Sequence, residues 1–328
     1  MGDITETYLR DQLLTRRQKL ESARATGKEG ESLAQLLNEV DSALGRLEAG
    51  TYGICEECRE PVEKDRLLAD PLVRYCLDHL TESQRRALEE DLELAAQVQR
   101  ELLPKQPLSF GGWQVSYHYQ PLGMVSGDYC DVVIHEDGSK GLFFALGDAS
   151  GKGVAASMLM AQLHAILRTL IATGLPVQAL VERAGRVFCE STMPTFFATL
   201  ICGRAGVSGE IDICNAGHCP ALLVQAGKVS RLEATGVPLG LFCDGTYTPK
   251  RVQLAPGDTL FLYTDGLSEA RSADNQEYGE GRLAEVMAQR HGLPAHDLIP
   301  ACLEDLRAFR RGTPLADDLT LMTIHRVS

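Results

Sequence analysis

From about residue 110 onward, the sequence contains many short apolar runs bounded by Gly, Asp or Pro. Such runs are typical of β-strands, and neighbouring ones are expected to pair as antiparallel strands. They read GLFFALGD, ATLICGR, EIDICNAG, ALLVQAG, DTLFLYTDG and LTLMTIH. Longer periodic segments predict helices at 153–173, 176–190, 279–291 and 295–310. The pattern therefore predicts an α+β domain with antiparallel sheets.

The first hundred residues follow a helical period instead. One apolar face predicts a helix over roughly residues 33–47, and a weaker pattern predicts another before it. The polar stretch TGKEGES (26–32) lies between them as a turn, so we expect a helical hairpin.

A further helix is predicted at 81–103, where apolar residues recur at heptad-like spacing and Gln99 interrupts them. Leu88, Leu92, Ala95 and Leu102 form this stripe. An isolated helix of this length is marginal in water, so its apolar face needs a partner. Two partners stay open: the same helix of a second chain, giving a parallel coiled-coil homodimer, or the C-terminal domain of its own chain.

These patterns predict three parts. Residues 1–80 hold the hairpin and a cysteine-rich segment, 81–107 form a linker helix, and 108–328 form the C-terminal domain.

The ten cysteines fall into two groups. Cys55-Glu-Glu-Cys58 is followed by Cys76-Leu-Asp-His79, and two such knuckles can close a tetrahedral structural site for one Zn²⁺. The other seven are scattered among apolar residues, as in Phe188-Cys189. We expect these to be buried free thiols in a reducing compartment.

Four short acidic motifs carry the chemistry. They are centred on Asp128 (SGDYCD), Asp148 (GDASGKG), Asp265 (YTDG) and Asp317 (ADDLT). An aspartate where an apolar strand ends can point its carboxylate into a cleft, and several together offer the oxygen ligands that Mg²⁺ or Mn²⁺ prefers. GDASGKG is not a phosphate-binding P-loop, because the spacing of its glycines and the residue after its lysine do not match.

Charge and hydropathy exclude some classes of function. The formal net charge of −13 disfavours non-specific nucleic-acid binding, which needs Lys and Arg on phosphates. No run approaches the roughly 18 consecutive apolar residues of a membrane span, and the first residues lack a signal-peptide pattern. We therefore expect a cytoplasmic protein without a membrane partner.

The order of the motifs resembles a known family. SGDYCD, GDASGKGVAASMLM, NAGHCPALL, GVPLGL, DTLFLYTDGLSEAR and DDLTLMTI form the motif series of the PPM family of metal-dependent phosphatases, closest to its SpoIIE/RsbU branch. The resemblance covers about residues 110–328, and LELAAQVQRELLPKQP resembles the linker helix that precedes this domain.

This resemblance implies a fold of two stacked antiparallel sheets flanked by helices. It also implies a two-metal Mn²⁺ or Mg²⁺ centre that hydrolyses phosphoserine or phosphothreonine of a protein of the anti-anti-sigma type. Matched motif by motif, Asp128, Asp148, Asp265 and Asp317 are the metal-binding catalytic carboxylates, and the carbonyl of Ala149 is a further ligand.

Four other residues of these motifs keep open roles. Asp131 and Asp318 are either ligands or neighbours of ligands. His218 either protonates the leaving oxygen or holds a turn, and Lys152 either touches phosphate or is an exposed loop lysine.

The cysteine-rich segment resembles the DksA/TraR zinc finger. ALGRLEAGTYGICEECREPVEKDRLLADPLVRYC carries this resemblance, which implies a Zn²⁺ bound by Cys55, Cys58, Cys76 and His79. In that family the finger accompanies binding to RNA polymerase through acidic residues at the hairpin tip. Here SARATGKEGES lacks paired aspartates, and His79 stands where a cysteine is commoner. The resemblance to this family suggests an alternative function: a transcription regulator that binds RNA polymerase and carries a non-catalytic phosphatase-like domain.

Overall fold

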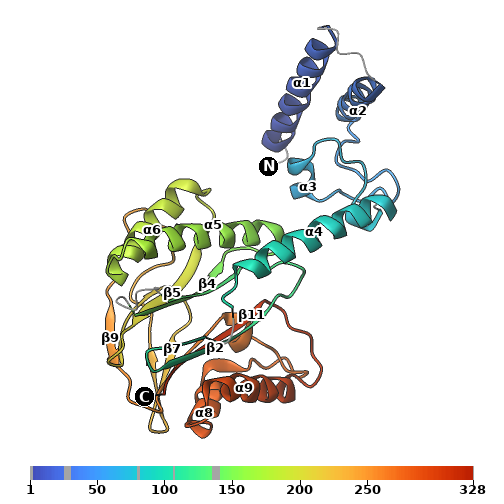
Figure 1. Cartoon of the computed structure of the whole chain (residues 1–328). Coiled ribbons are helices and arrows are strands. Elements are labelled where there is room, and N and C mark those ends of the chain that lie inside the picture. Colours follow the sequence, from blue (N-terminus) through green and yellow to red (C-terminus); the bar gives the residue numbers. More distant parts are fainter. Residues whose placement is uncertain (1–2, 26–30, 80–81, 106–107, 135–140, 328) are drawn as a thin grey trace. The chain divides into compact units, whose positions relative to one another are not determined.

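The computed structural model describes residues 3–25, 31–79, 82–105, 108–134 and 141–327 (Figure 1). The chain divides into two compact units, Met1–Asp91 and Leu92–Ser328. The division falls within the segment that the sequence assigns to the linker.

In the first unit, two helices precede the cysteine-rich segment. They are α1 (Asp3–Ala25) and α2 (Glu31–Glu48), with a buried seam that includes Leu13, Val40 and Ala43. The centre of the predicted turn, 26–30, lies outside the described residues. The short helices α3 (Lys64–Ala69) and η1 (Leu77–His79) follow in the cysteine-rich segment.

The second unit contains two antiparallel sheets (Figure 1). One has the strand order β1-β2-β11-β10-β7-β8 and the other β3-β4-β5-β6-β9. The strands of the first are β1 (Leu108–Phe110), β2 (Trp113–Gln120), β7 (Ala221–Gln225), β8 (Lys228–Leu232), β10 (Thr259–Tyr263) and β11 (Leu319–Arg326). Those of the second are β3 (Asp128–Ile134), β4 (Leu142–Ala149), β5 (Ala198–Ala205), β6 (Glu210–Ala216) and β9 (Lys250–Gln253).

Helices cover the outer faces of both sheets. α5 (Gly153–Ala172) and α6 (Val177–Ser191) pack on the β3–β9 sheet, while α8 (Gly279–Gln289) and α9 (Ala295–Arg310) pack on the other. Successive side chains of a strand point to opposite faces of its sheet, so one set faces the core between the two sheets and the other faces the core beneath the helices. In β4, Phe144 faces the opposite sheet, which contains β2, β10 and β11, whereas Phe143 faces the helices, and both are buried. The predicted two-sheet α+β fold is confirmed.

Helix α5 is the one described helix long and apolar enough, by length and composition alone, to cross a membrane. Its Leu163 and Leu167 are buried in the core beneath it, and its Arg168 pairs with Asp131 of β3. α5 therefore packs as a core helix of this unit.

The linker helix α4 (Glu82–Leu102) has its apolar residues on more than one face. Ala96 and Gln99 are buried, whereas the side chains of Leu88, Leu94 and Val98 are 42%, 60% and 58% exposed. Packing on the helix's own domain thus uses one part of the apolar surface and leaves another part open.

The cysteines correct one prediction. Cys189, near the end of α6, and Cys243, in the loop before β9, form a disulfide with Cα atoms 5.3 Å apart. The expectation that all seven scattered cysteines are free thiols is therefore wrong for these two. The fold joins positions separated by 54 residues, which no local spacing could reveal. The other five are free, and four of them are buried.

Candidate metal centres

The aspartates of the four acidic motifs lie where strands of both sheets end. Asp128 begins β3 and faces Asp148 directly across the antiparallel β3–β4 pair. Asp265 begins the short helix α7 (Asp265–Ser268) immediately after β10, and Asp317 precedes β11, the antiparallel neighbour of β10. Each sheet therefore supplies two of these aspartates.

Side chains from the opposite sheet, the one that contains β10 and β11, hold Asp128 in place. Its Oδ2 accepts hydrogen bonds from the hydroxyls of Thr264 (3.0 Å) and Thr320 (2.5 Å). Burial, followed by the charge of Asp148, raises the pKa of the Asp128 carboxyl well above its usual range. The two hydroxyl donors oppose that shift by stabilising the carboxylate, and they tie the ends of the two sheets together.

The turns that carry Asp265 and Asp317 pack backbone against backbone. A Cβ on Gly266 would lie only 1.8 Å from the carbonyl oxygen of Asp318, so only glycine fits between the two motifs. This contact explains why the third motif needs its glycine.

The loop of the first motif packs over the end of β4. Gly127 accepts a hydrogen bond from the backbone N–H of Ala149 (3.1 Å). A Cβ on Gly127 would lie 3.1 Å from the Ala149 carbonyl oxygen and 3.4 Å from Oδ1 of Asp148. The predicted carbonyl and carboxylate oxygens are therefore neighbours.

Accumulated negative charge distinguishes this place. Burial raises the pKa of Asp148 to about 7, and the carboxylates of Asp265, Asp317 and Asp318 act in the same direction. The pKa of Asp265 is raised by burial and then by Asp317. Such mutual repulsion is relieved by a bound cation, and the hard oxygen donors suit Mg²⁺ or Mn²⁺.

The arrangement is looser than a closed ligand cage. In the described part of the chain, no group of three acidic side chains brings its carboxylate oxygens within 4.8 Å of one another. Lys152 contributes a positive charge, since its Nζ lies 2.7 Å from Oδ2 of Asp317 and donates to the carbonyl of Ala316. Lys152 is thus an exposed loop lysine that pairs with a predicted ligand.

Asp131 and Asp318 both bond to protein groups. Asp131 lies on the opposite side of β3 from Asp128, fully buried, where the guanidinium of Arg168 donates two hydrogen bonds of 2.6 Å to it. Asp318 accepts hydrogen bonds from the backbone N–H groups of Leu122 (2.7 Å) and Gly127 (2.9 Å). Asp131 therefore anchors α5, and Asp318 fixes the loop before β3.

His218 is buried in a turn held by its motif. The side-chain oxygen of Asn215 accepts the backbone N–H of His218 (2.8 Å), and Thr199 Oγ1 lies 2.7 Å from His218 Nδ1. Burial lowers the pKa of this imidazole to about 4, which keeps it neutral at physiological pH. The turn-holding role fits this environment better than that of an acid.

Gln99, which interrupts the apolar stripe of the predicted linker helix, lies next to the site. Its amide donates to the carbonyl of Ser126 (2.7 Å) and accepts from the N–H of the same residue (3.0 Å). Ser126 Oγ in turn accepts the backbone N–H of Asp128 (3.0 Å). The sequence feature that could have identified Gln99 as a neighbour of the site is its position as a polar residue within an apolar helical stripe.

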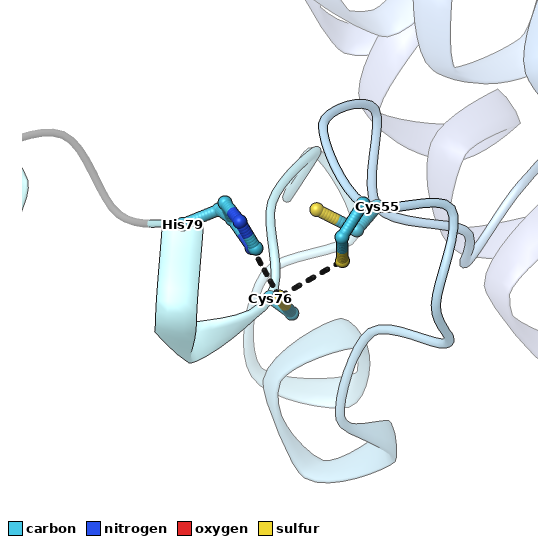
Figure 2. Close-up of side chains that lie close together, drawn as sticks. Cys55, Cys76 and His79 are labelled. Carbon is cyan, nitrogen blue, oxygen red and sulfur yellow. Dashed lines mark hydrogen bonds between the residues drawn. The ribbon is translucent and has the colours of Figure 1, made fainter.

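The second centre is the cysteine cluster of the first unit. The ligand atoms of Cys55, Cys58, Cys76 and His79 all lie within 4.8 Å of one another. Figure 2 shows Cys55, Cys76 and His79 pointing toward one another, with Nδ1 of His79 3.2 Å from Sγ of Cys76. These four residues match the predicted set.

The donors of this cluster suit zinc. Burial raises the pKa of the Cys55 thiol, but hydrogen bonds from the backbone of Cys58 and Cys76 outweigh this effect and lower the pKa to about 6. A thiol with a lowered pKa provides the thiolate that binds metal. Three sulfurs and one imidazole nitrogen form a Cys₃His set, which is typical of structural Zn²⁺.

Two family models match the parts of the chain that contain most residues of the two candidate centres. The family model of Stage II sporulation protein E (SpoIIE) matches residues 138–327, and that of the prokaryotic dksA/traR C4-type zinc finger matches residues 50–78. The finger model spans the three cysteines and stops before His79.

Individual relatives cover different shares of the chain. Phosphoserine phosphatase RsbU of Bacillus subtilis is 24% identical over 247 residues, which are 73% of this chain and 71% of RsbU. Protein IcfG of Synechocystis sp. is 26% identical over 265 residues, 72% of this chain but only 41% of IcfG. The SiaA-PP2C domain of Pseudomonas aeruginosa shares the fold, with a TM-score of 0.65 at 19% identity over 74% of this chain and 98% of that domain.

The SpoIIE model matches more than half of the chain and includes the motifs of Asp148, Asp265 and Asp317. With two stacked antiparallel sheets and a PP2C-like fold neighbour, the chain belongs to the SpoIIE family of PPM-type phosphatase domains, preceded by a zinc finger of the DksA/TraR type.

Proposed function

We propose that the chain is a metal-dependent serine/threonine protein phosphatase of the regulatory kind. The observation that carries this proposal is the convergence of Asp128, Asp148, Asp265 and Asp317 from the strand ends of two sheets. Membership of the SpoIIE family and similarity to the phosphoserine phosphatase RsbU support it.

Two Mn²⁺ or Mg²⁺ ions would be held by Asp148, Asp265, Asp317 and the carbonyl of Ala149. Asp128 is more deeply buried than these three aspartates. When bound, such ions lower the pKa of water and neutralise the phosphoryl oxygens. The chain's own contribution is to fix the donors. Thr264 orients Asp128, and the Gly266 contact sets the spacing of the last two motifs.

The names of two relatives support a proposal for the substrate class. RsbU and RsbP of Bacillus subtilis are both named phosphoserine phosphatases. We propose that this chain likewise acts on a phosphorylated protein, and that the protein is of the anti-anti-sigma, partner-switching type.

Control would come through helix α4. Gln99 connects this helix to Ser126, two residues before Asp128, so a shift of the helix reaches the centre through backbone hydrogen bonds. The exposed Leu94 and Val98 of the same helix offer an apolar surface for a second copy of the chain. The proposed regulated state is therefore a homodimer.

A second candidate function is a transcription regulator that binds RNA polymerase through the zinc finger, with a non-catalytic C-terminal domain. The finger match over residues 50–78 favours it. Retention of all four acidic motifs and the lack of paired aspartates in SARATGKEGES favour the enzyme.

One experiment tests the enzyme directly. Full-length protein, loaded with Zn²⁺ and depleted of other metals, should hydrolyse an aryl phosphate and phosphoserine peptides only after Mn²⁺ or Mg²⁺ is added. Asp265→Asn should lower the rate by orders of magnitude and keep the circular dichroism of the folded chain. Undiminished hydrolysis without added metal would refute the proposal.

A further inference from the structure

A small apolar groove opens beside Asp317. Its volume is about 320 Å³, and its walls come from the loop before β3, the first turn of α5 and Leu92 of α4. Leu122, Met124 and Val154 line it and are 46%, 38% and 51% exposed. Apolar side chains that gather in an open groove mark a place where a partner binds more often than scattered single ones do.

The apolar surface extends along α5 from the groove. Met158 stands one helical turn after Val154 on the same face and is 69% exposed. α5 begins at Gly153, directly after Lys152, whose ammonium group pairs with Asp317. The exposed apolar surface therefore continues from the groove along the helix, away from the acidic centre.

The loop wall of the groove is held in place. Asp318 accepts two hydrogen bonds from the loop, at Leu122 and Gly127, and Gln99 forms its paired bonds with Ser126. A wall fixed at both ends presents Leu122 and Met124 at defined positions, which lowers the entropy that a ligand must overcome.

We propose that this groove binds an apolar side chain that lies a few residues from the phosphoserine of the substrate, and so selects the phosphoprotein. The inference rests on the proposed function, because Asp317 is both a groove wall and a proposed metal ligand. A chain bound there therefore continues directly into the centre.

Volume and charge define the occupant. A cavity of this size takes one large aliphatic side chain with adjoining backbone, and is near the low end of ligand pockets. The charged residues that line the groove are two aspartates, Asp317 and Asp318, and one lysine, Lys152. This excess of negative charge disfavours an acidic side chain in the groove. The favoured residue is therefore leucine, isoleucine or methionine.

The test uses full-length protein with Mn²⁺ and a set of alanine-based phosphoserine peptides that differ only in where one leucine replaces alanine. An apolar side chain that fills a pocket changes kcat/KM by about 10-fold to 200-fold. One leucine position should therefore exceed the all-alanine peptide by at least about tenfold.

The variant Val154→Asp should reduce this ratio between leucine and alanine peptides to near one. Val187→Asp, a matched change at an exposed valine of α6, should retain the ratio. Hydrolysis of an aryl phosphate, measured in every variant, shows whether the centre itself works and normalises the peptide rates.

Two results would overturn the groove: no leucine position that raises kcat/KM, or a leucine preference that persists in Val154→Asp. A loss of dimer mass on light scattering in Val154→Asp, without a change in the ratio, would assign the groove to a second copy instead. If wild type hydrolyses neither aryl phosphate nor peptide with Mn²⁺ or Mg²⁺, the proposed function fails first, which is a distinguishable outcome.

Discussion

Replacing Arg168 by methionine should destabilise the second unit without changing its affinity for metal. Arg168 donates two hydrogen bonds to the fully buried carboxylate of Asp131. Without the guanidinium, this carboxylate keeps hydrogen bonds from the hydroxyl of Tyr129 and the N–H of Val132, and the imidazole of His164 lies 3.9 Å away. Methionine preserves much of the aliphatic packing of the arginine.

The expected size follows from burial. Removing one partner of a buried ion pair costs about 3–5 kcal/mol. The Arg168 side chain is 41% exposed, so water reaches the pair and we expect about 2–3 kcal/mol. For a unit of this size, that corresponds to a fall in Tm of about 4–12 °C.

The assay is denaturant unfolding of full-length protein, followed by circular dichroism, with Mn²⁺ binding measured by calorimetry. Replacing both partners, as Asp131→Leu with Arg168→Met, should recover part of the loss, because no buried charge is left unpaired. Arg183→Met on α6 is the control. A Mn²⁺ affinity that falls more than about tenfold (1.4 kcal/mol) with unchanged stability would refute our reasoning and make Asp131 part of the metal centre.

Four other predictions concern separate features. Cys58→Ser should lose a tightly held Zn²⁺ and loosen the finger, which elemental analysis and proteolysis would show; wild type purified without chelators and without zinc would contradict the site. Gln99→Leu should leave the buried backbone N–H and carbonyl of Ser126 unpaired, cost about 2–5 kcal/mol and weaken Mn²⁺ binding on calorimetry. Leu94→Glu with Val98→Glu should shift light-scattering mass from dimer to monomer; a monomeric wild type at micromolar concentration would end the coiled-coil proposal. Cys189→Ala, by opening a disulfide across 54 residues, should lower stability by about 4 kcal/mol in non-reducing buffer, and an unchanged denaturation midpoint would argue against that bond.

Sequence patterns predict local features of this chain well. Runs such as LFFALGDA and TLFLY become β4 and β10, and the helices predicted at 153–173 and 295–310 begin at the expected residues. Knuckle spacing selected Cys55 and its three partners, because both halves of each ligand pair are close in the chain.

Contacts between distant segments could not be predicted in this way. Thr320 bonds Asp128 from 192 residues away, and nothing in either motif specifies that partner. The Cys189 disulfide is hidden for the same reason. Asp131 is different: a three-residue step along a strand reverses the face, so its separation from Asp128 was readable once the strand was recognised.

The place of β11 in its sheet has a consequence for how the molecule is made. β2 pairs with β11, in a register that joins Trp113 to Arg326, and its other neighbour is the short β1. During synthesis at about 5–20 residues per second, β2 waits about 10–40 s before its main partner leaves the ribosome. Asp317 arrives with that same partner, so the hydrogen-bonding edge of β2 and the acidic cluster are completed by one late event. Until then the nascent chain carries an open strand edge that other chains can pair with, which makes this interval the one in which a chaperone would matter most.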